Sequence, residues 1–137
     1  MDATPTTATV AAPRVLVARF VAAMRAQAGT FGAREGAALA LANALVREWT
    51  AIELAELEAT FPDEVRVEGA RYRRHEPGTV EYHALSGGVA VRRWTYRRCG
   101  VHNGRTIVPL ELAAGLRHGA TPALAYAVAQ GYAQVPL

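Results

Sequence analysis

The sequence predicts an α+β fold in which N-terminal helices precede a small antiparallel β-meander and a short C-terminal helix follows it. Three observations predict this order. Apolar residues recur at helical spacing up to about residue 60, alternate with polar residues from 65 to 108, and return to helical spacing after Pro109. The chain of 137 residues is 51% hydrophobic, which suits one domain with its own core.

The expected segments differ in composition. Residues 1–12 are small, rich in threonine and without a pattern, which predicts a disordered lead-in. A helical segment over 13–62, a basic antiparallel meander over 63–108 and a C-terminal helical segment over 109–137 then follow. Within the first helical segment, Pro13 suits an opening turn and Gly29 suits the end of that helix.

A second helix is expected from about Ala33. Its apolar stripe consists of Leu41, Leu45, Trp49 and Ile52. Thr50 with Glu53 matches a capping box with its hydrophobic staple, which favours a break and a restart at this point. One continuous helix is the alternative, because threonine costs only about a few tenths of a kcal/mol in a helix interior. The Phe-Pro pair at 61–62 ends the helix in either case.

The alternating region predicts strands joined by tight turns. Gly69, Pro77-Gly78, Ser86 to Gly88 and Asn103-Gly104 supply the turn signals, with Pro77-Gly78 matching a type II turn. The expected strands are 65–67, 70–74, 79–84, 89–98 and 106–108, of which 89–98 is the longest.

Two short helices are expected after the sheet. The first begins at Pro109 and ends at Gly115, and its apolar residues are Leu110, Leu112 and Leu116. Thr121-Pro122 begins the second, as N-cap and first helical position. One face of this last helix carries Leu124, Val128 and Tyr132.

Positive charge is concentrated in the sheet region. Residues 1–64 carry 5 arginines and 8 acidic residues, residues 65–118 carry 10 and 4, and residues 119–137 carry none. Arginine suits phosphate binding, because its planar guanidinium donates two parallel hydrogen bonds. The predicted nucleic-acid-binding residues are Arg71, Arg73, Arg74, Arg92, Arg93, Arg97, Arg98 and Arg105.

A structural alternative accounts for the same residues. The outer face of an antiparallel sheet needs polar cover, and charged strands protect against aggregation. Alternation puts Arg93 and Arg97 on one face of the long strand, while Arg92 and Arg98 join Trp94 and Tyr96 on the other. We expect the aromatic residues to fill the core rather than to stack on bases, because the chain has few other large apolar side chains.

Few residues are suited to metal binding or catalysis. Cys99 and His102 have the spacing of a metal knuckle, but zinc needs four ligands and no second pair exists, so neither a metal nor a cofactor is predicted. A nuclease needs clustered carboxylates, and the only aspartates are Asp2 and Asp63. The sequence therefore predicts a chain that is not an enzyme. With no cation in the first twelve residues and no unbroken apolar span, we expect a cytoplasmic protein that does not cross a membrane.

The region from Val65 onward resembles the N-terminal region of bacterial insertion-sequence transposases of the ISKra group and their relatives. The matching elements are Y-H-x-L-x-G-x-V-x-V-x-R from Tyr82 to Arg93, the W-T-Y-R that follows, the run from Val108 to Leu112 with Gly115-Leu116, and the Thr121-Pro122 helix start. The resemblance covers residues 65–135, and the order of these elements carries it.

This resemblance implies a region that binds DNA and supports assembly ahead of an RNase H-like catalytic domain. Relatives often carry a zinc ribbon here, whereas this chain keeps only Cys99, so a degenerate, metal-free version of the ribbon is expected. Because the catalytic domain is absent, the chain is expected to be a truncated transposase, with DNA as its partner and a homo-oligomer as a further possibility.

A second function class remains open. The chain is alternatively a small, non-enzymatic interaction protein that dimerises through an apolar helix face. The two candidate faces are Leu124, Val128 and Tyr132 on the last helix, and Leu41, Leu45 and Trp49 on the second helix.

Overall fold

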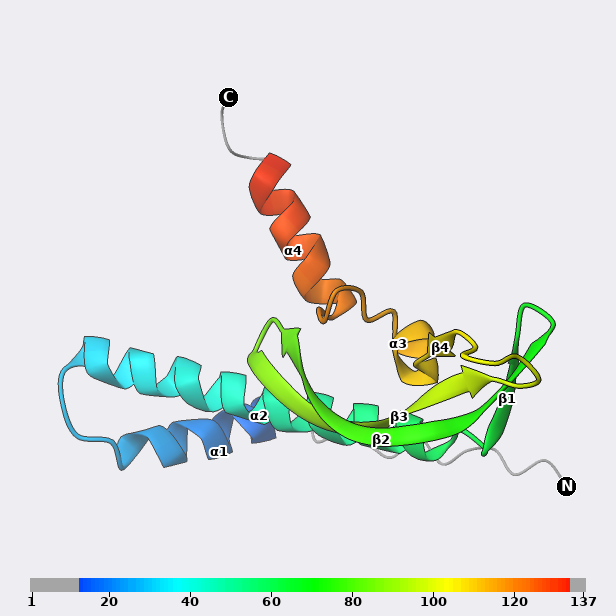
Figure 1. The fold of residues 1–137 in the computed structure, drawn as a ribbon. Coiled ribbons are helices and arrows are strands. Elements are labelled where there is room, and N and C mark those ends of the chain that lie inside the picture. Colours follow the sequence, from blue (N-terminus) through cyan, green and yellow to red (C-terminus); the bar gives the residue numbers. More distant parts are fainter. Residues whose placement is uncertain (1–12, 134–137) are drawn as a thin grey trace, which may run out of the picture. The chain divides into compact units, whose positions relative to one another are not determined.

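The computed structural model describes residues 13–133, so the lead-in predicted for residues 1–12 lies outside the described residues, as do residues 134–137. It has helices, a four-stranded antiparallel sheet and a short C-terminal helix, which confirms the predicted α+β class (Figure 1). The chain divides into two compact units, Met1–Ala42 and Asn43–Leu137.

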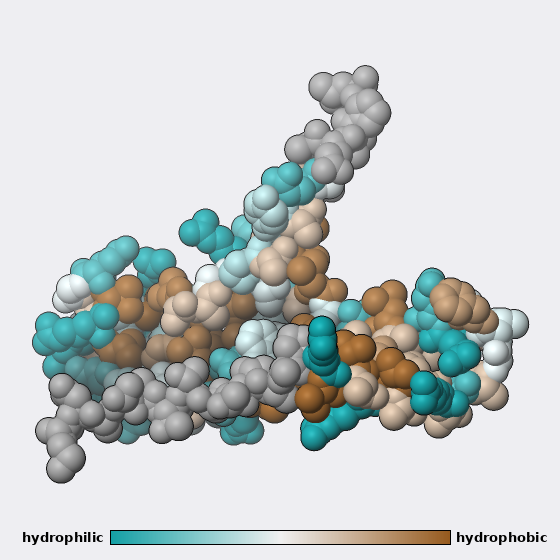
Figure 2. Space-filling view, turned by 180° about the vertical axis from the view of Figure 1, so that it is seen from behind, coloured by the Kyte–Doolittle hydropathy of each residue, from teal (hydrophilic) through white to brown (hydrophobic). Residues whose placement is uncertain are grey.

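The first unit holds helix α1 (Pro13–Arg25) and the opening turns of helix α2 (Phe31–Ala59). The hydroxyl of Thr30 accepts a hydrogen bond from the Ala33 N–H at 3.2 Å, so α2 begins two residues before the predicted start. Every side chain from 14 to 42 is exposed or half-buried. Apolar side chains therefore lie at the surface of α1, where Figure 2 shows brown residues among teal ones; they include Val15, Leu16, Val17 and Val21.

Helix α2 is continuous from Phe31 to Ala59, so the predicted break at Thr50 is wrong and the alternative of one helix is right. The Thr50 hydroxyl donates to the carbonyl of Val46 at 2.8 Å, four residues earlier, instead of capping a new helix. In the second unit, α2 buries Leu54 and Glu58, while Trp49 of the predicted apolar stripe is 60% exposed. Within the second unit, none of Leu45, Trp49 and Ile52 belongs to the core cluster that Leu54 forms with the sheet.

The sheet has the order β1 (Glu64–Val67), β2 (Ala70–Ala84), β3 (Gly87–Arg98) and β4 (Thr106–Ile107), with every pair antiparallel. The type II turn predicted at Pro77-Gly78 is wrong, because β2 runs straight through these residues. Pro77 pairs with Trp94. The backbone N–H of Trp94 points away from β2 and donates to the Glu58 carboxylate at 2.8 Å. The missing N–H of Pro77 therefore removes no hydrogen bond between β2 and β3, and β2 rather than β3 is the longest strand.

The pairing of β2 with β3 shifts by one residue between Arg74 and Glu76, and this bulge divides the core. On the hairpin side of the bulge, Val89 and Val91 of β3 are buried against α2 and α3. On the other side, the buried β3 residue is Tyr96, whose side chain lies on the opposite face of the strand from those of Val89 and Val91. The sheet thus buries one face in its hairpin half and the other face in the half that contains β1 and β4.

Two short helices complete the second unit. Helix α3 (Pro109–Ala114) ends at Gly115, whose φ of 68° lies in the left-handed region that favours glycine. Helix α4 (Pro122–Ala133) begins as predicted, with the Thr121 hydroxyl accepting from the Leu124 N–H. Of the face predicted on α4, Leu124 is half-buried and Val128 is 48% exposed, while the side chain of Tyr132 lies outside the described residues.

Among the residues described, no helix has the length and apolar character needed to cross a membrane.

Two leucines on α3 give a matched test of the hairpin core. Leu110 is 0% exposed, whereas Leu112 is 60% exposed. We expect Leu110→Ala to lower the free energy of unfolding by about 2–5 kcal/mol, because it removes buried methyl groups and leaves a cavity. Leu112→Ala should change it by less than about 0.5 kcal/mol. Urea denaturation followed by circular dichroism measures both, and equal losses would contradict this packing.

Candidate nucleic-acid interface

The eight arginines predicted to bind nucleic acid do not form one set in the structure. Two of them, Arg74 and Arg93, point into the second unit and bind its own groups. Three others, Arg71, Arg73 and Arg97, share one exposed face of the sheet. The remaining three lie elsewhere on the surface: Arg92, Arg98 and Arg105.

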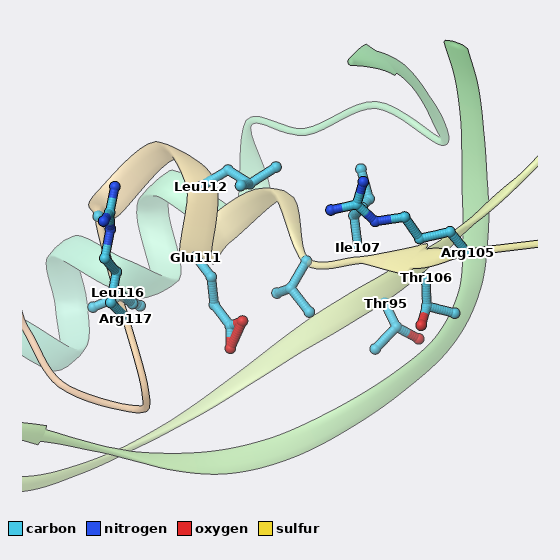
Figure 3. Close-up of a pocket in the computed structure, with 10 residues that line it drawn as sticks. Thr95, Arg105, Thr106, Ile107, Glu111, Leu112, Leu116 and Arg117 are labelled. Carbon is cyan, nitrogen blue, oxygen red and sulfur yellow. The ribbon is translucent and has the colours of Figure 1, made fainter. Parts of the chain in front are cut away.

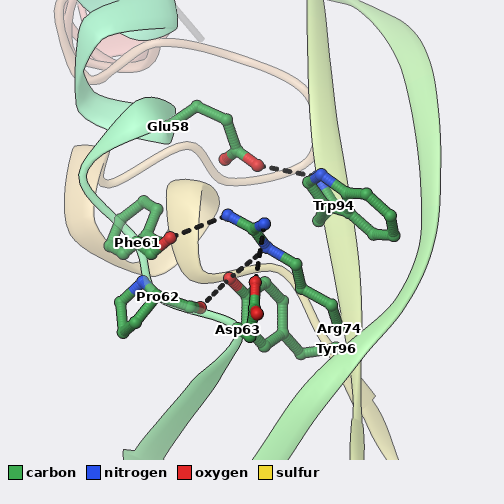
Figure 4. A network of polar contacts seen from close by, with 7 residues as sticks. All are labelled: Glu58, Phe61, Pro62, Asp63, Arg74, Trp94 and Tyr96. Atoms are coloured by element: carbon green, nitrogen blue, oxygen red, sulfur yellow. Dashed lines mark hydrogen bonds and ion pairs between the residues drawn. The ribbon is translucent and has the colours of Figure 1, made fainter.

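Arg74 joins the end of α2 to the sheet (Figure 4). Its guanidinium donates to the Phe61 carbonyl at 2.8 Å and to the Tyr96 hydroxyl at 3.3 Å, and it pairs with Asp63 at 2.8 Å. It also lies 5.3 Å from the centre of the Trp94 ring. The hydrogen bond to Tyr96 holds the pKa of Arg74 above its ordinary value. The prediction that Arg74 contacts DNA therefore does not fit, since its donors are engaged within the protein.

Arg93 also serves an internal contact. Its Nε donates to the Tyr82 hydroxyl at 3.1 Å, and that hydroxyl donates to Glu111 Oε1 at 3.2 Å. Burial raises the pKa of the Tyr82 phenol, and the hydrogen bond from Arg93 partly offsets this rise. The chain from Arg93 through Tyr82 fixes one oxygen of the Glu111 carboxylate on the side of α3 that faces the strands.

Four arginines form the exposed cluster that we call the arginine face: Arg66, Arg71, Arg73 and Arg97. Arg66 pairs with Arg71 across β1 and β2, and Arg73 pairs with Arg97 across β2 and β3. Because Arg71 and Arg73 are two residues apart on β2, both pairs lie on the same side of the sheet.

The strand pairing places two acidic residues on this side of the sheet: Glu64, the partner of Arg73, and the exposed Glu76, the partner of Thr95, which lies two residues before Arg97 on β3. The Glu64 carboxylate lies 3.6 Å from Arg71 and 3.5 Å from Arg73, whose side chains remain 56% and 71% exposed. Within the described residues, Arg66 and Arg97 form no ion pair or side-chain hydrogen bond. Four cations and two anions leave this surface with a net charge of two positive units.

The arginine face is exposed because the opposite face of this half of the sheet is buried. The side chains that alternate with the arginines pack on the inner side together with Ile107; they are Val65, Val67, Tyr72 and Tyr96. Arg66 is not among the arginines predicted from the sequence to bind nucleic acid, since it stands alone between Val65 and Val67. The alternation of that Val-Arg-Val run was the signal that could have identified it.

The aromatic residues of the sheet belong to the core, as expected. Tyr72, Tyr82 and Tyr96 are at most 5% exposed, and Trp94 is half-buried beneath Arg74. None of these four offers an open ring on which a base could stack. Any affinity for nucleic acid from the arginine face would therefore come from phosphate contacts.

Cys99 and His102 do not form a metal site in the described residues. Cys99 is half-buried beside β2, where its backbone N–H donates to the Arg71 carbonyl at 2.9 Å, and His102 is exposed in the following turn. No group of three or more potential ligand side chains is found among the residues that the structure describes.

Neighbouring arginines on β2 separate a structural role from a surface role. We expect Arg74→Ala to lower the midpoint of urea denaturation, because it leaves the Tyr96 hydroxyl and the Phe61 carbonyl without their donor. Arg73→Ala should leave the midpoint nearly unchanged, because an exposed ion pair contributes little. If both variants unfold at the same midpoint, the network around Arg74 does not hold α2 to the sheet.

Comparison with known proteins adds no family to this description. The chain matches no protein-family model, and no curated protein and no solved structure is significantly similar to it. The resemblance to insertion-sequence transposases and the role of the arginine face both stay predictions.

Proposed function

We propose that this chain is a non-catalytic DNA-binding protein that contacts phosphates through the arginine face, and that it corresponds to the DNA-binding and assembly region of an insertion-sequence transposase. One observation carries the DNA-binding part. Four arginines from three strands share an exposed face on which the only carboxylates placed by the strand pairing of the described residues are Glu64 and Glu76.

The pairing of these arginines favours a functional role over a structural one. Like charges directly opposite each other destabilise a sheet, and both Arg66–Arg71 and Arg73–Arg97 are such pairs. An outer face that needs only polar cover gains nothing from this arrangement. A polyanion removes the repulsion, since each phosphate that binds neutralises a guanidinium and releases condensed counterions.

The spacing of the arginines suits a nucleic-acid backbone. Residues two apart on a strand are separated by about 6.8 Å, and neighbouring strands lie about 4.8 Å apart. Each nucleotide of one strand rises by about 3.4 Å along a duplex axis and is also turned about that axis, so consecutive phosphates lie further apart than this rise. The spacing of Arg71 and Arg73 on β2 is therefore comparable to that of consecutive phosphates of one strand, with Arg66 and Arg97 on either side.

The transposase part of the proposal is supported by sequence likeness over residues 65–135, from Tyr82 to Arg93 above all. A role in binding without catalysis fits the shortage of carboxylates, since Asp2 and Asp63 are the only aspartates. We place the protein in the cytoplasm, where bacterial DNA is available to it.

A double substitution on the arginine face tests DNA binding. We expect Arg73→Ala with Arg97→Ala to weaken binding to a labelled duplex at low salt by roughly tenfold or more, and to make the log–log salt dependence shallower by about 1.8, because two phosphate contacts are lost. Fluorescence anisotropy titrations at several salt concentrations measure both quantities. Glu64→Gln should strengthen binding, because it removes the anion that lies next to Arg71 and Arg73.

The matched control is Arg92→Ala with Arg98→Ala. It removes the same charge from β3 at exposed positions outside the arginine face. This control should lose much less affinity. Equal losses in the two double variants would mean that net charge alone attracts DNA, and no binding by the unaltered protein at low salt would end the proposal.

One observation supports the alternative function, a non-enzymatic protein that self-associates. Leu45, Trp49 and Ile52 form one stripe on α2 and are 57%, 60% and 57% exposed. The occupant that fits this stripe is a second copy of the chain, because three uncharged side chains along one helix are self-complementary under a two-fold axis. Such a small patch supports a weak dimer rather than an obligate one.

Sedimentation velocity distinguishes this alternative. If α2 mediates self-association, Trp49→Ser with Ile52→Ser should shift the protein towards monomer, whereas Val101→Ser, at a 51% exposed position outside the helices, should not. The arginine variants should leave the association constant unchanged. A strict monomer at all concentrations would exclude the alternative.

A further inference from the structure

A cavity of about 380 Å³ lies between α3 and the strands β3 and β4 (Figure 3). Its lining includes Thr95 from β3, Thr106 from β4, and Glu111 and Leu112 from α3. The Glu111 side chain points from α3 towards the strands, on the side where Thr95 and Thr106 lie. The volume is in the range of pockets that hold a small organic ligand, about 300–1,000 Å³.

The cavity continues the arginine face. Thr106 is the direct cross-strand partner of Arg97, and Thr95 precedes Arg97 by two residues on the same side of β3. A strand of nucleic acid held by Arg73 and Arg97 would therefore pass the mouth of the cavity. Two further cations, Arg105 and Arg117, lie at its lining and are exposed.

Glu111 places a carboxylate in the lining of the cavity, and one of its two oxygens is available to accept a hydrogen bond from a ligand. Glu111 Oε1 accepts from the Tyr82 hydroxyl, which is itself bound by Arg93. Within residues 13–133, Glu111 Oε2 has no hydrogen-bond partner. A fixed carboxylate repels a phosphate but binds an amine, so the group that enters the cavity is a hydrogen-bond donor.

The remaining lining suits the flat, weakly polar body of a base. Ile107 and Leu116 are buried at the cavity, and Leu112 is 60% exposed there. The two threonine hydroxyls add short polar groups at the strand side. The lining therefore combines these apolar walls with a larger polar part from the threonines, Glu111 and the arginines, and such a mixed pocket can bind a ring system that carries polar edge groups.

We propose that the cavity binds one unpaired base of single-stranded DNA whose phosphates lie on the arginine face, with Glu111 accepting a hydrogen bond from the exocyclic amine of the base. This inference rests on the proposed DNA-binding function. The base must be unpaired, because the amine of a paired base is engaged on its Watson–Crick edge. Carboxylates recognise the N4 amine of cytosine in this way.

Two oligonucleotides of equal length test the proposal. Cytosine carries an amine where thymine carries a carbonyl, and the two rings are the same size. At mildly alkaline pH we expect the unaltered protein to bind labelled oligo(dC) about five- to tenfold more tightly than oligo(dT) in anisotropy titrations, since a single base contact gives about this discrimination.

Glu111→Gln should bring the ratio of the two affinities close to one. The glutamine carbonyl still accepts from Tyr82, while its amide offers a donor that suits the thymine carbonyl. Glu81→Gln, at an exposed position of β2 outside the cavity, makes the same charge change and should keep the preference. Leu112→Trp, which fills the cavity from an exposed position, should also abolish the preference.

These measurements distinguish base binding in the cavity from phosphate binding by the arginine face. Arg73→Ala with Arg97→Ala should weaken both oligonucleotides and leave their ratio unchanged. Equal binding of oligo(dC) and oligo(dT) by the unaltered protein, or a preference that survives Glu111→Gln, would overturn the cavity proposal while the phosphate contacts stand. If neither oligonucleotide nor a duplex binds at low salt, the proposed DNA-binding function fails and the cavity proposal fails with it.

Discussion

The second unit depends on one irregularity, the one-residue shift in pairing between Arg74 and Glu76. A regular hairpin keeps the same face inward along its whole length, because side chains alternate with period two. The extra residue of β2 at the bulge, His75, reverses the alternation on β2, so that Tyr82 on the hairpin side and Tyr72 on the other side are buried on opposite faces although both are even-numbered. The arginine face is the outer surface that this reversal creates.

Arg74 lies at this shift and connects β2 to the segment between α2 and β1. Its backbone N–H donates to the Asp63 carbonyl at 2.9 Å, and its guanidinium holds Phe61 and Asp63 at the connection from α2 to β1. Glu58 reinforces the same region by accepting the Trp94 N–H, although its Oε2 has no partner among the described residues. A carboxylate that is 9% exposed needs nearby cationic charge, which Arg74 provides.

The sequence predicted the fold class and most element ends, because those depend on local chemistry. Pro13, Gly115 and Thr121-Pro122 act through their own backbone angles or hydroxyls, and all three mark helix ends in the structure. Pro77-Gly78 forms no turn although its residues match one, because a proline in a non-hydrogen-bonded pair is compatible with a strand. That compatibility depends on β3 and Glu58, which lie far away in the sequence.

The candidate site was less predictable for the same reason. Arg73 and Arg74 are adjacent and chemically identical, yet one is exposed and the other binds Tyr96 within the protein. Ordinary alternation places the two on opposite faces of β2, and the packing of Phe61, Val65 and Val67 on one face decides which arginine is covered. Local pattern thus identified the basic strands, while tertiary pairing decided which arginines remain available.

The outer edge of β2 has one more consequence for the protein. Beyond Arg73, β1 no longer covers this edge, and an uncovered strand is a template for edge-to-edge aggregation. The edge is blocked at both ends, at Arg74 by the Asp63 carbonyl and at His83 by hydrogen bonds with Gly119 and Thr121. Alternation from His83 places Pro77 on the same edge, where it offers no N–H to an incoming strand. The proline that resembles a turn signal thus protects a long strand from intermolecular pairing.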